Sequence, residues 1–188
     1  RAPSASLPRP AMPDGTQSRP YATLAEALAH PVSPRTIVVA RGAYELPPGT
    51  AATGHEVTAE LTILGRAATG DDATVITVAA GSAAFALRGA GASLALANVK
   101  LQAPPSSAAP LVTASNGAAL LASQVVFDGG SDGVRAEGMG TEVSLEHVLL
   151  RGASLTSLRA LRGASAVMRQ SQASAGALAG VLIDGASL

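Results

Sequence analysis

Short apolar triplets that end in a glycine turn recur along most of the chain. Successive triplets begin at nearly constant intervals, at Ile37, Leu61, Phe85, Leu111, Val134, Leu158 and Val181. Two more triplets follow within the later repeats, for example 120–122 and 125–127. In each triplet apolar and small side chains alternate, which is typical of strands whose inward residues face a core. Three short strands in each repeat predict a coil that stacks on the next coil.

The repeat therefore predicts an all-β fold, a single-stranded parallel β-helix of about seven coils of 23–26 residues, with coils from residue 37 onward. A short helix is predicted over 23–30, because Thr23 and Glu26 form a capping-box pattern and Leu24 and Leu28 share one face. This helix is expected to cap the first coil.

The two ends of the chain differ from the repeats. Residues 1–20 contain five of the 12 prolines and predict an extended linker, which leaves 21–188 as the β-helix domain. The last apolar triplet, 181–183, stands close to the end of the chain. We expect the native protein to continue beyond Leu188 or to dock a partner there, because an uncovered coil end exposes apolar side chains.

A polar position recurs between the second and third strands of the later repeats. It is occupied by Asn98, Gln124, His147 and Gln170. Stacked coils place such residues over one another, so we expect a ladder of side chains at a sharp bend that satisfies unpaired backbone groups. His147 is interpreted as a member of this ladder, because no second histidine or carboxylate stands at metal-ligand or catalytic spacing. The sequence predicts no metal and no cofactor.

Composition narrows the possible partners. The chain is 47% hydrophobic, 14% charged and 2% aromatic, and its formal net charge is zero. Neutrality argues against nucleic acid, and the short apolar runs argue against membrane insertion. The absence of cysteine excludes disulfides and thiolate metal sites. Few aromatic and charged residues suit a narrow stacked coil, in which Ala, Val and Leu fit most easily.

The N-terminal part of the domain resembles a known family. The segments 14–16, 20–21, 23–24, 36–39 and 42–44 read Asp-Gly-Thr, Pro-Tyr, Thr-Leu, Thr-Ile-Val-Val and Gly-Ala-Tyr. They are similar to the opening of secreted bacterial right-handed parallel β-helix repeat proteins of the pectin-lyase-like superfamily. The resemblance implies a right-handed coil, a capping helix and a secreted, periplasmic or cell-surface location. It leaves function open, because the superfamily contains lyases, hydrolases, adhesins and noncatalytic modules.

The enzyme motifs of that superfamily are not found in the chain. Its hydrolases carry a Gly-His-Gly segment and an Arg-x-Lys pair, whereas here His55 precedes Glu56 and the sole lysine, Lys100, has no arginine two positions before it. The acidic pair 71–72 and the segment 128–133 are interpreted as turns rather than as catalytic or calcium sites. Whether the protein is an enzyme is left open, and a noncatalytic scaffold or binding module of a larger protein is favoured.

Two alternatives stay open. One is a polysaccharide-active lyase or hydrolase whose site lies outside this segment or is unrecognised within it. The other is a structural protein that assembles through its open coil end or through an apolar stripe. The side chains at the outward positions of the strands are the features of the sequence that can distinguish these alternatives.

A charged outward face is the best candidate binding site. Alternation predicts one outward ladder of Ala86, Val112, Arg135, Arg159 and Leu182, and a second of Arg88, Ala114, Glu137, Leu161 and Asp184. Arg88, Arg135, Glu137 and Arg159 are the predicted ligand-binding residues, since guanidinium groups bind carboxylates bidentately. The partner would be an acidic polysaccharide or a protein, and the competing interpretation is an ordinary charge-paired surface.

An apolar outward set suggests a protein partner. Leu121, Val126, Leu149 and Val167 are all predicted to point outward, and Val126 and Leu149 occupy equivalent positions in consecutive coils. A contiguous apolar stripe on a surface is typical of an interaction site. An error of one position in the register would remove it.

Overall fold

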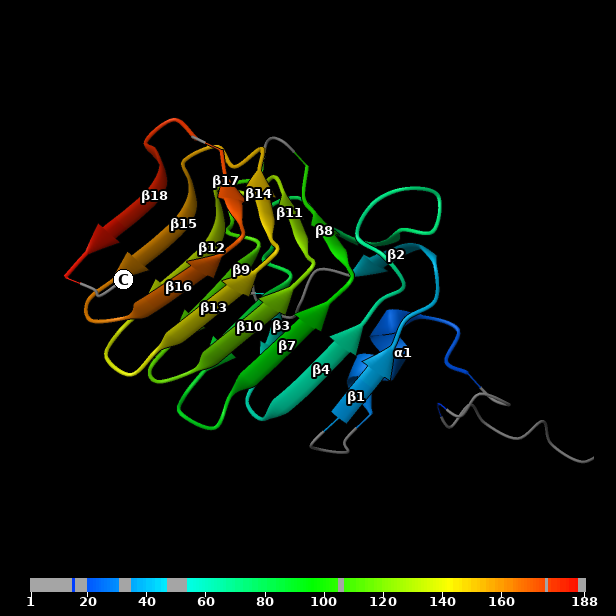
Figure 1. Cartoon of the computed structure of the whole chain (residues 1–188). Coiled ribbons are helices and arrows are strands. Elements are labelled where there is room, and N and C mark those ends of the chain that lie inside the picture. The colour runs from blue at the N-terminus through cyan, green and yellow to red at the C-terminus, as the bar shows by residue number, and fades with distance from the viewer. Residues whose placement is uncertain are drawn as a thin grey trace, which may run out of the picture.

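Three parallel sheets, each of six strands, run side by side along a solenoid (Figure 1). The computed structural model describes residues 15, 20–30, 35–46, 54–104, 107–174 and 176–185. The first sheet contains β1 (Arg35–Val38), β4 (Glu60–Leu64), β7 (Ser93–Ala97), β10 (Ala119–Ser123), β13 (Glu142–Glu146) and β16 (Ser165–Arg169). The second sheet contains β2 (Gly42–Leu46), β5 (Thr74–Val78), β8 (Lys100–Gln102), β11 (Val126–Asp128), β14 (Leu149–Arg151) and β17 (Gln172–Ala173). The third sheet contains β3 (His55–Val57), β6 (Phe85–Arg88), β9 (Val112–Ser115), β12 (Asp132–Glu137), β15 (Thr156–Leu161) and β18 (Ala179–Asp184).

The predicted all-β parallel β-helix is confirmed, with six turns among the described residues. The prediction of about seven coils counts one turn too many. The first two triplets, at Ile37 and Leu61, lie in strands of the first sheet, whereas the triplets from Phe85 onward lie in or beside strands of the third sheet. The turn length also varies more than predicted. Leu61 pairs with Leu94 across a long stretch of chain, whereas Val112 pairs with Val134 across a much shorter one.

The core is a stack of inward residues from all three sheets. In the first sheet Leu94 pairs with Leu120, which pairs with Val143, and all three are buried. Phe127 fills the corresponding space in the second sheet, in register with Leu101 and Leu150, and is fully buried. Each such side chain contributes about 1.5–3 kcal/mol by leaving water. Inward residues of one turn therefore contact those of the turns before and after it.

The predicted short helix is confirmed as α1 (Leu24–Ala29). Its capping box is formed as the sequence indicates: Thr23 Oγ1 accepts from the Glu26 backbone N–H at 3.1 Å, and Glu26 Oε2 accepts from the Thr23 N–H at 3.3 Å. Leu24 and Leu28 join the core cluster of the solenoid. The helix therefore lies against the first turn as a cap. The predicted linker 1–20 lies outside the described residues except for positions 15 and 20.

Candidate functional site

The outward face of the third sheet brings most of the predicted ligand-binding residues together. Arg135 on β12 and Arg159 on β15 are paired in register, so they lie about 4.8 Å apart along the solenoid. Arg135 also donates to Glu137 at 3.4 Å. Arg88 lies apart from them, because Ser115 separates it from Glu137 in the register. Two strand spacings make that separation roughly 10 Å.

Two further charged residues belong to this site and were not predicted. Arg162, at the corner after β15, donates to the second carboxylate oxygen of Glu137. Asp132, at the start of β12, lies 4.0 Å from a terminal guanidinium nitrogen of Arg159. We call Asp132, Arg135, Glu137, Arg159 and Arg162 the third-sheet cluster. Its only two acids are each placed beside arginine.

Asp132 is the most buried member of the third-sheet cluster and is only 2% exposed. Burial raises the pKa of its carboxyl group, while the charges of Arg159 and Arg135 act in the opposite direction. Among the described residues, Asp132 Oδ1, Thr156 Oγ1 and Arg159 Nε are buried without a hydrogen-bond partner. Burial hides the negative charge, whereas the side chain of Arg162 is 79% exposed. The solvent therefore meets a basic surface.

The predicted register of this face is wrong at β9. Thr113, not Val112, pairs with Ala86 and Arg135, and Ser115, not Ala114, pairs with Arg88 and Glu137. Val112 and Ala114 are buried. A slip of one position moves side chains to the opposite face of a strand. The outward ladder between Arg88 and Glu137 is thus polar rather than apolar.

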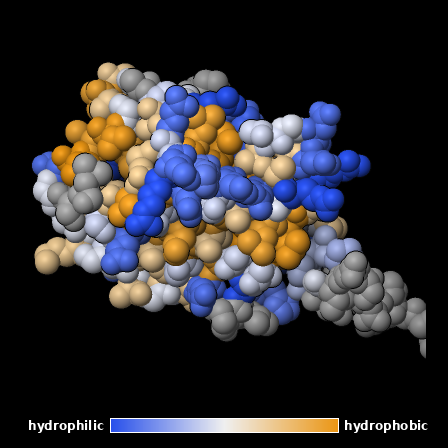
Figure 2. Space-filling view, viewed as in Figure 1, coloured by the Kyte–Doolittle hydropathy of each residue, from blue (hydrophilic) through white to orange (hydrophobic). Residues whose placement is uncertain are grey.

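The predicted apolar stripe exists only in part. Leu121 is 49% exposed and Val167 is 40% exposed on the first sheet, where Ser144 lies between them in register. On the second sheet Val126 and Leu149 do pair in register. However, Val126 is only 5% exposed, so the surface position predicted for it is wrong, and Leu149 is partly buried. Figure 2 shows hydrophobic residues interrupting the polar surface over the first and second sheets.

A second charged group on the second sheet was not predicted. Asp128 Oδ2 accepts from Lys100 Nζ at 2.9 Å and from Arg151 at 3.1 Å. Burial raises the pKa of Asp128, but the hydrogen bonds and charges of Lys100 and Arg151 outweigh it, so the pKa lies below its usual value. The sequence signal was available, because Asp128 and Arg151 end equivalent strands. In this trio both cations bind the same carboxylate, so the three residues connect three successive turns.

The glycines after Asp128 form the predicted turn between β11 and β12. Gly129 has φ 96°, and a side chain there would place Cβ 2.4 Å from the carbonyl oxygen of Ala103. Only glycine fits this position. The carboxylates at its two ends, Asp128 and Asp132, are directed to different cations rather than to a common point.

The polar corner residues occupy equivalent bends between the first and second sheets. Asn98, Gln124, His147 and Gln170 all have left-handed backbone conformations, with φ between 48° and 56°. The backbone N–H groups of Asn98, Gln124 and His147 donate to carbonyl oxygens of the next turn, for example His147 N–H to the Arg169 carbonyl at 3.0 Å. The side chains of Gln124, His147 and Gln170 are exposed. The exposed part of the ladder therefore lies outside the coil, and the backbone-satisfying role predicted for the ladder is wrong for the N–H groups of Asn98, Gln124 and His147.

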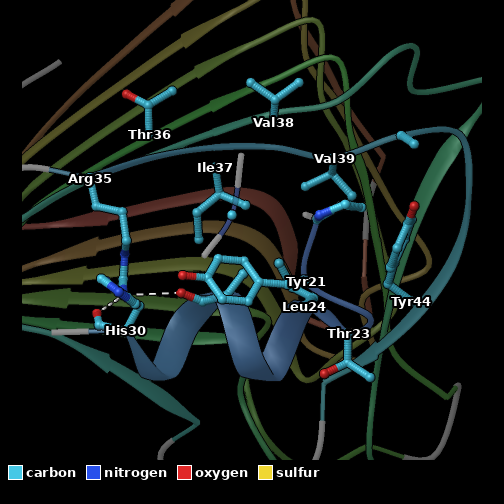
Figure 3. A pocket seen from close by; sticks show the side chains of 14 residues that line it. Tyr21, Thr23, Leu24, His30, Arg35, Thr36, Ile37, Val38, Val39 and Tyr44 are labelled. Atoms are coloured by element: carbon cyan, nitrogen blue, oxygen red, sulfur yellow. Dashed lines mark hydrogen bonds between the residues drawn. The ribbon is translucent and has the colours of Figure 1, made fainter. Parts of the chain in front are cut away.

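A cavity of about 460 Å³ lies at the N-terminal end, between α1 and β1 (Figure 3). Both tyrosines, Tyr21 and Tyr44, line it together with Ile37 and Arg35. In Figure 3 Arg35 and Ile37 point toward the helix. The Arg35 guanidinium donates to the carbonyls of Ala27 and Leu28 at 3.2 and 2.8 Å and also to that of His30. It thus serves as the C-terminal cation of the helix, which has no basic residue in its last turn.

Burial lowers the pKa of Arg35, and the electrostatic interaction with Tyr21 raises it by a smaller amount. The cavity has the size of a small-molecule pocket. Within the described ranges, the arginine that lines this cavity, Arg35, already donates its hydrogen bonds to the helix carbonyls.

Comparison of the chain with protein-family models, curated proteins and solved structures finds no match. In the part of the chain that the structure describes, no three carboxylate or imidazole side chains gather as a metal site. No helix within the same residues is long and apolar enough to cross a membrane.

Proposed function

We propose that the protein is a noncatalytic β-helical scaffold whose third sheet binds an acidic partner, as a module of a larger secreted or cell-surface bacterial protein. The resemblance of residues 14–44 to pectin-lyase-like β-helix proteins supports the secreted bacterial setting. The binding role rests on one observation: Arg135, Arg159 and Arg162 cover the recessed Asp132 and the partly buried Glu137.

A stacked solenoid suits this role because it holds its outward side chains at fixed positions. Arg135 and Arg159 come from the adjacent strands β12 and β15, which pair along most of their length. Little conformational freedom remains to be lost by the backbone on binding, which favours affinity. Arginine can engage a carboxylate with two parallel hydrogen bonds, so a polymer with repeated carboxylates fits the spacing of adjacent strands.

The test is binding to a panel of acidic polysaccharides, such as polygalacturonate and alginate, measured by isothermal titration calorimetry at low and high salt. Replacing Arg135 and Arg162 by glutamine should weaken binding by about tenfold or more, since each charge-assisted hydrogen bond contributes about 1.5–3 kcal/mol. Arg169→Gln, an exposed arginine on the first sheet, is the matched control and should bind as the parent does.

Binding that is equally strong in the double variant, or no binding to any acidic polymer or protein, would overturn the proposal. Thermal melting of each variant separates loss of binding from loss of fold. Release of new reducing or unsaturated ends from the polysaccharide would contradict the noncatalytic part alone.

A further inference from the structure

The first sheet and the centre of the third sheet carry outward charges of opposite sign, although the chain as a whole is neutral. The first sheet is acidic over β4 to β13, where Glu60, Glu142 and Glu146 are exposed and the outward positions hold no lysine or arginine. Arg169, on β16, is the basic residue on the outward face of this sheet. The outward charges of the first sheet therefore sum to a negative value.

The third sheet presents the opposite sign over β6 to β15. Arg88 and Arg162 are exposed, and Arg135, Arg159 and Glu137 are partly exposed, whereas Asp132 is buried. The remaining acids of this face, Glu56 and Asp184, lie on the two end strands β3 and β18. A basic centre is thus bounded by acidic ends.

From this charge partition we infer that the acidic partner of the third sheet is the first sheet of a second copy of this chain. The inference rests on the proposed function, because it names the partner of the same basic face. Unlike faces attract and like faces repel, which favours a contact between the first sheet of one copy and the third sheet of the next. Such a contact is heterologous, so it builds a ring or an open array rather than a twofold dimer.

The repeat distance of the two faces makes them compatible over several turns. Both are stacks of parallel strands of the same solenoid, so their outward residues recur at the same interval of about 4.8 Å. When two copies lie with their axes parallel, a contact made at one turn is repeated in register at the next. Leu121 and Val167 add exposed apolar surface to the acidic face.

The size of the contact sets its strength. The complementary part of each face spans four strands, each about five positions long, which gives roughly 19 by 17 Å, or about 320 Å². A stable specific interface buries about 800 Å² on each partner. Association through these faces is therefore weak and visible at high protein concentration, and screening makes it sensitive to salt.

The experiment is complementary charge exchange followed by analytical ultracentrifugation. One variant carries Glu142→Lys and Glu146→Lys on the first sheet, and another carries Arg88→Glu and Arg162→Glu on the third. The parent should show a mass that rises with concentration and falls back at about 0.5 M salt, a level at which the Debye length is only about 3–8 Å. Each variant alone should stay monomeric, and an equimolar mixture of the two should associate again.

Glu45→Lys on the second sheet is the matched control and should associate as the parent does. A parent that is monomeric at every concentration, a charge-exchanged variant that associates normally, or a mixture that fails to associate would overturn the inference. Circular dichroism verifies folding, and the milder pair Glu142→Gln and Glu146→Gln replaces the lysine variant if that variant unfolds.

The outcomes also separate this inference from the proposed function. The variant with lysines on the first sheet keeps its third sheet intact and should still bind acidic polysaccharide. Polysaccharide binding without self-association leaves the proposed function standing and rejects only the second copy as partner. Self-association without polysaccharide binding identifies the acidic partner as protein.

Discussion

Replacing His147 by glycine should stabilise the protein. His147 has φ 52°, a left-handed conformation that costs an L-residue about 1–2 kcal/mol. Glycine adopts it freely but adds about 0.5–1 kcal/mol of unfolded-state entropy. The backbone hydrogen bond from residue 147 to the Arg169 carbonyl does not need a side chain. The expected net gain is about 0.5–1 kcal/mol, or about 1–4 °C in melting temperature for a domain of this size.

Two comparisons make the test specific. Asn98→Gly at the equivalent corner should gain less, because asparagine tolerates the left-handed region better than histidine does. Ser144→Gly, at an exposed extended position of β13 in the same turn, should lose about 0.5–1 kcal/mol. Thermal and urea unfolding of the three variants would measure these differences. A His147→Gly protein that melts at or below the parent temperature would refute the argument that backbone strain dominates at this corner.

Other substitutions test the core, the cap and the buried carboxylates. Phe127→Ala should lower stability by about 3–5 kcal/mol in urea unfolding, because it empties a fully buried position; a loss below about 1 kcal/mol would contradict the packing. Thr23→Ala should cost about 1 kcal/mol and increase hydrogen exchange in α1, and unchanged exchange would show that the capping box contributes little. The pKa of Asp128 is lowered in the fold, so stability should fall as pH drops below about 4, and Asp128→Asn should remove that loss. The pKa of Asp132 is raised, so stability should decline as pH rises above about 4 through the native pKa; a decline of the same size in Asp132→Asn would exclude this carboxyl as its cause.

The later turns could be predicted from the sequence because each strand there follows its predecessor at a nearly constant interval. From β7 onward the inward residues of the first sheet, such as Leu94, Leu120 and Val143, recur with almost the same spacing. The first two turns were not separable in this way. In the second turn the connection from β4 to β5 is longer than the corresponding connections of the later turns, so the stretch of chain from His55 to its partner Phe85 exceeds the interval of the later repeats. A fixed period finds repeats only where the connections are equally short.

The sequence predicted which residues of the candidate site share a face of the sheet, but not how deeply each of them is buried. Strand alternation placed Arg135, Arg159 and Glu137 on one face, because the side-chain period of two is a local property. It could not show that Asp132 is buried beside Arg159 or that Val126 is covered, since burial depends on neighbouring turns. Arg162 was missed because it follows the strand, at a corner where alternation no longer applies.

The order in which the chain folds follows from the parallel stacking of turns. Among the described strand pairs, the chain between partners is shortest from Val112 to Val134 and longest from Leu61 to Leu94. Loop closure over such intervals costs nearly the same each time, because the entropy grows only with the logarithm of length. Once one pair of turns has formed, each later turn adds to an existing edge for a similar entropic loss. The folding rate of the solenoid should therefore depend on forming the first pair of turns, and the number of turns should affect the rate only weakly.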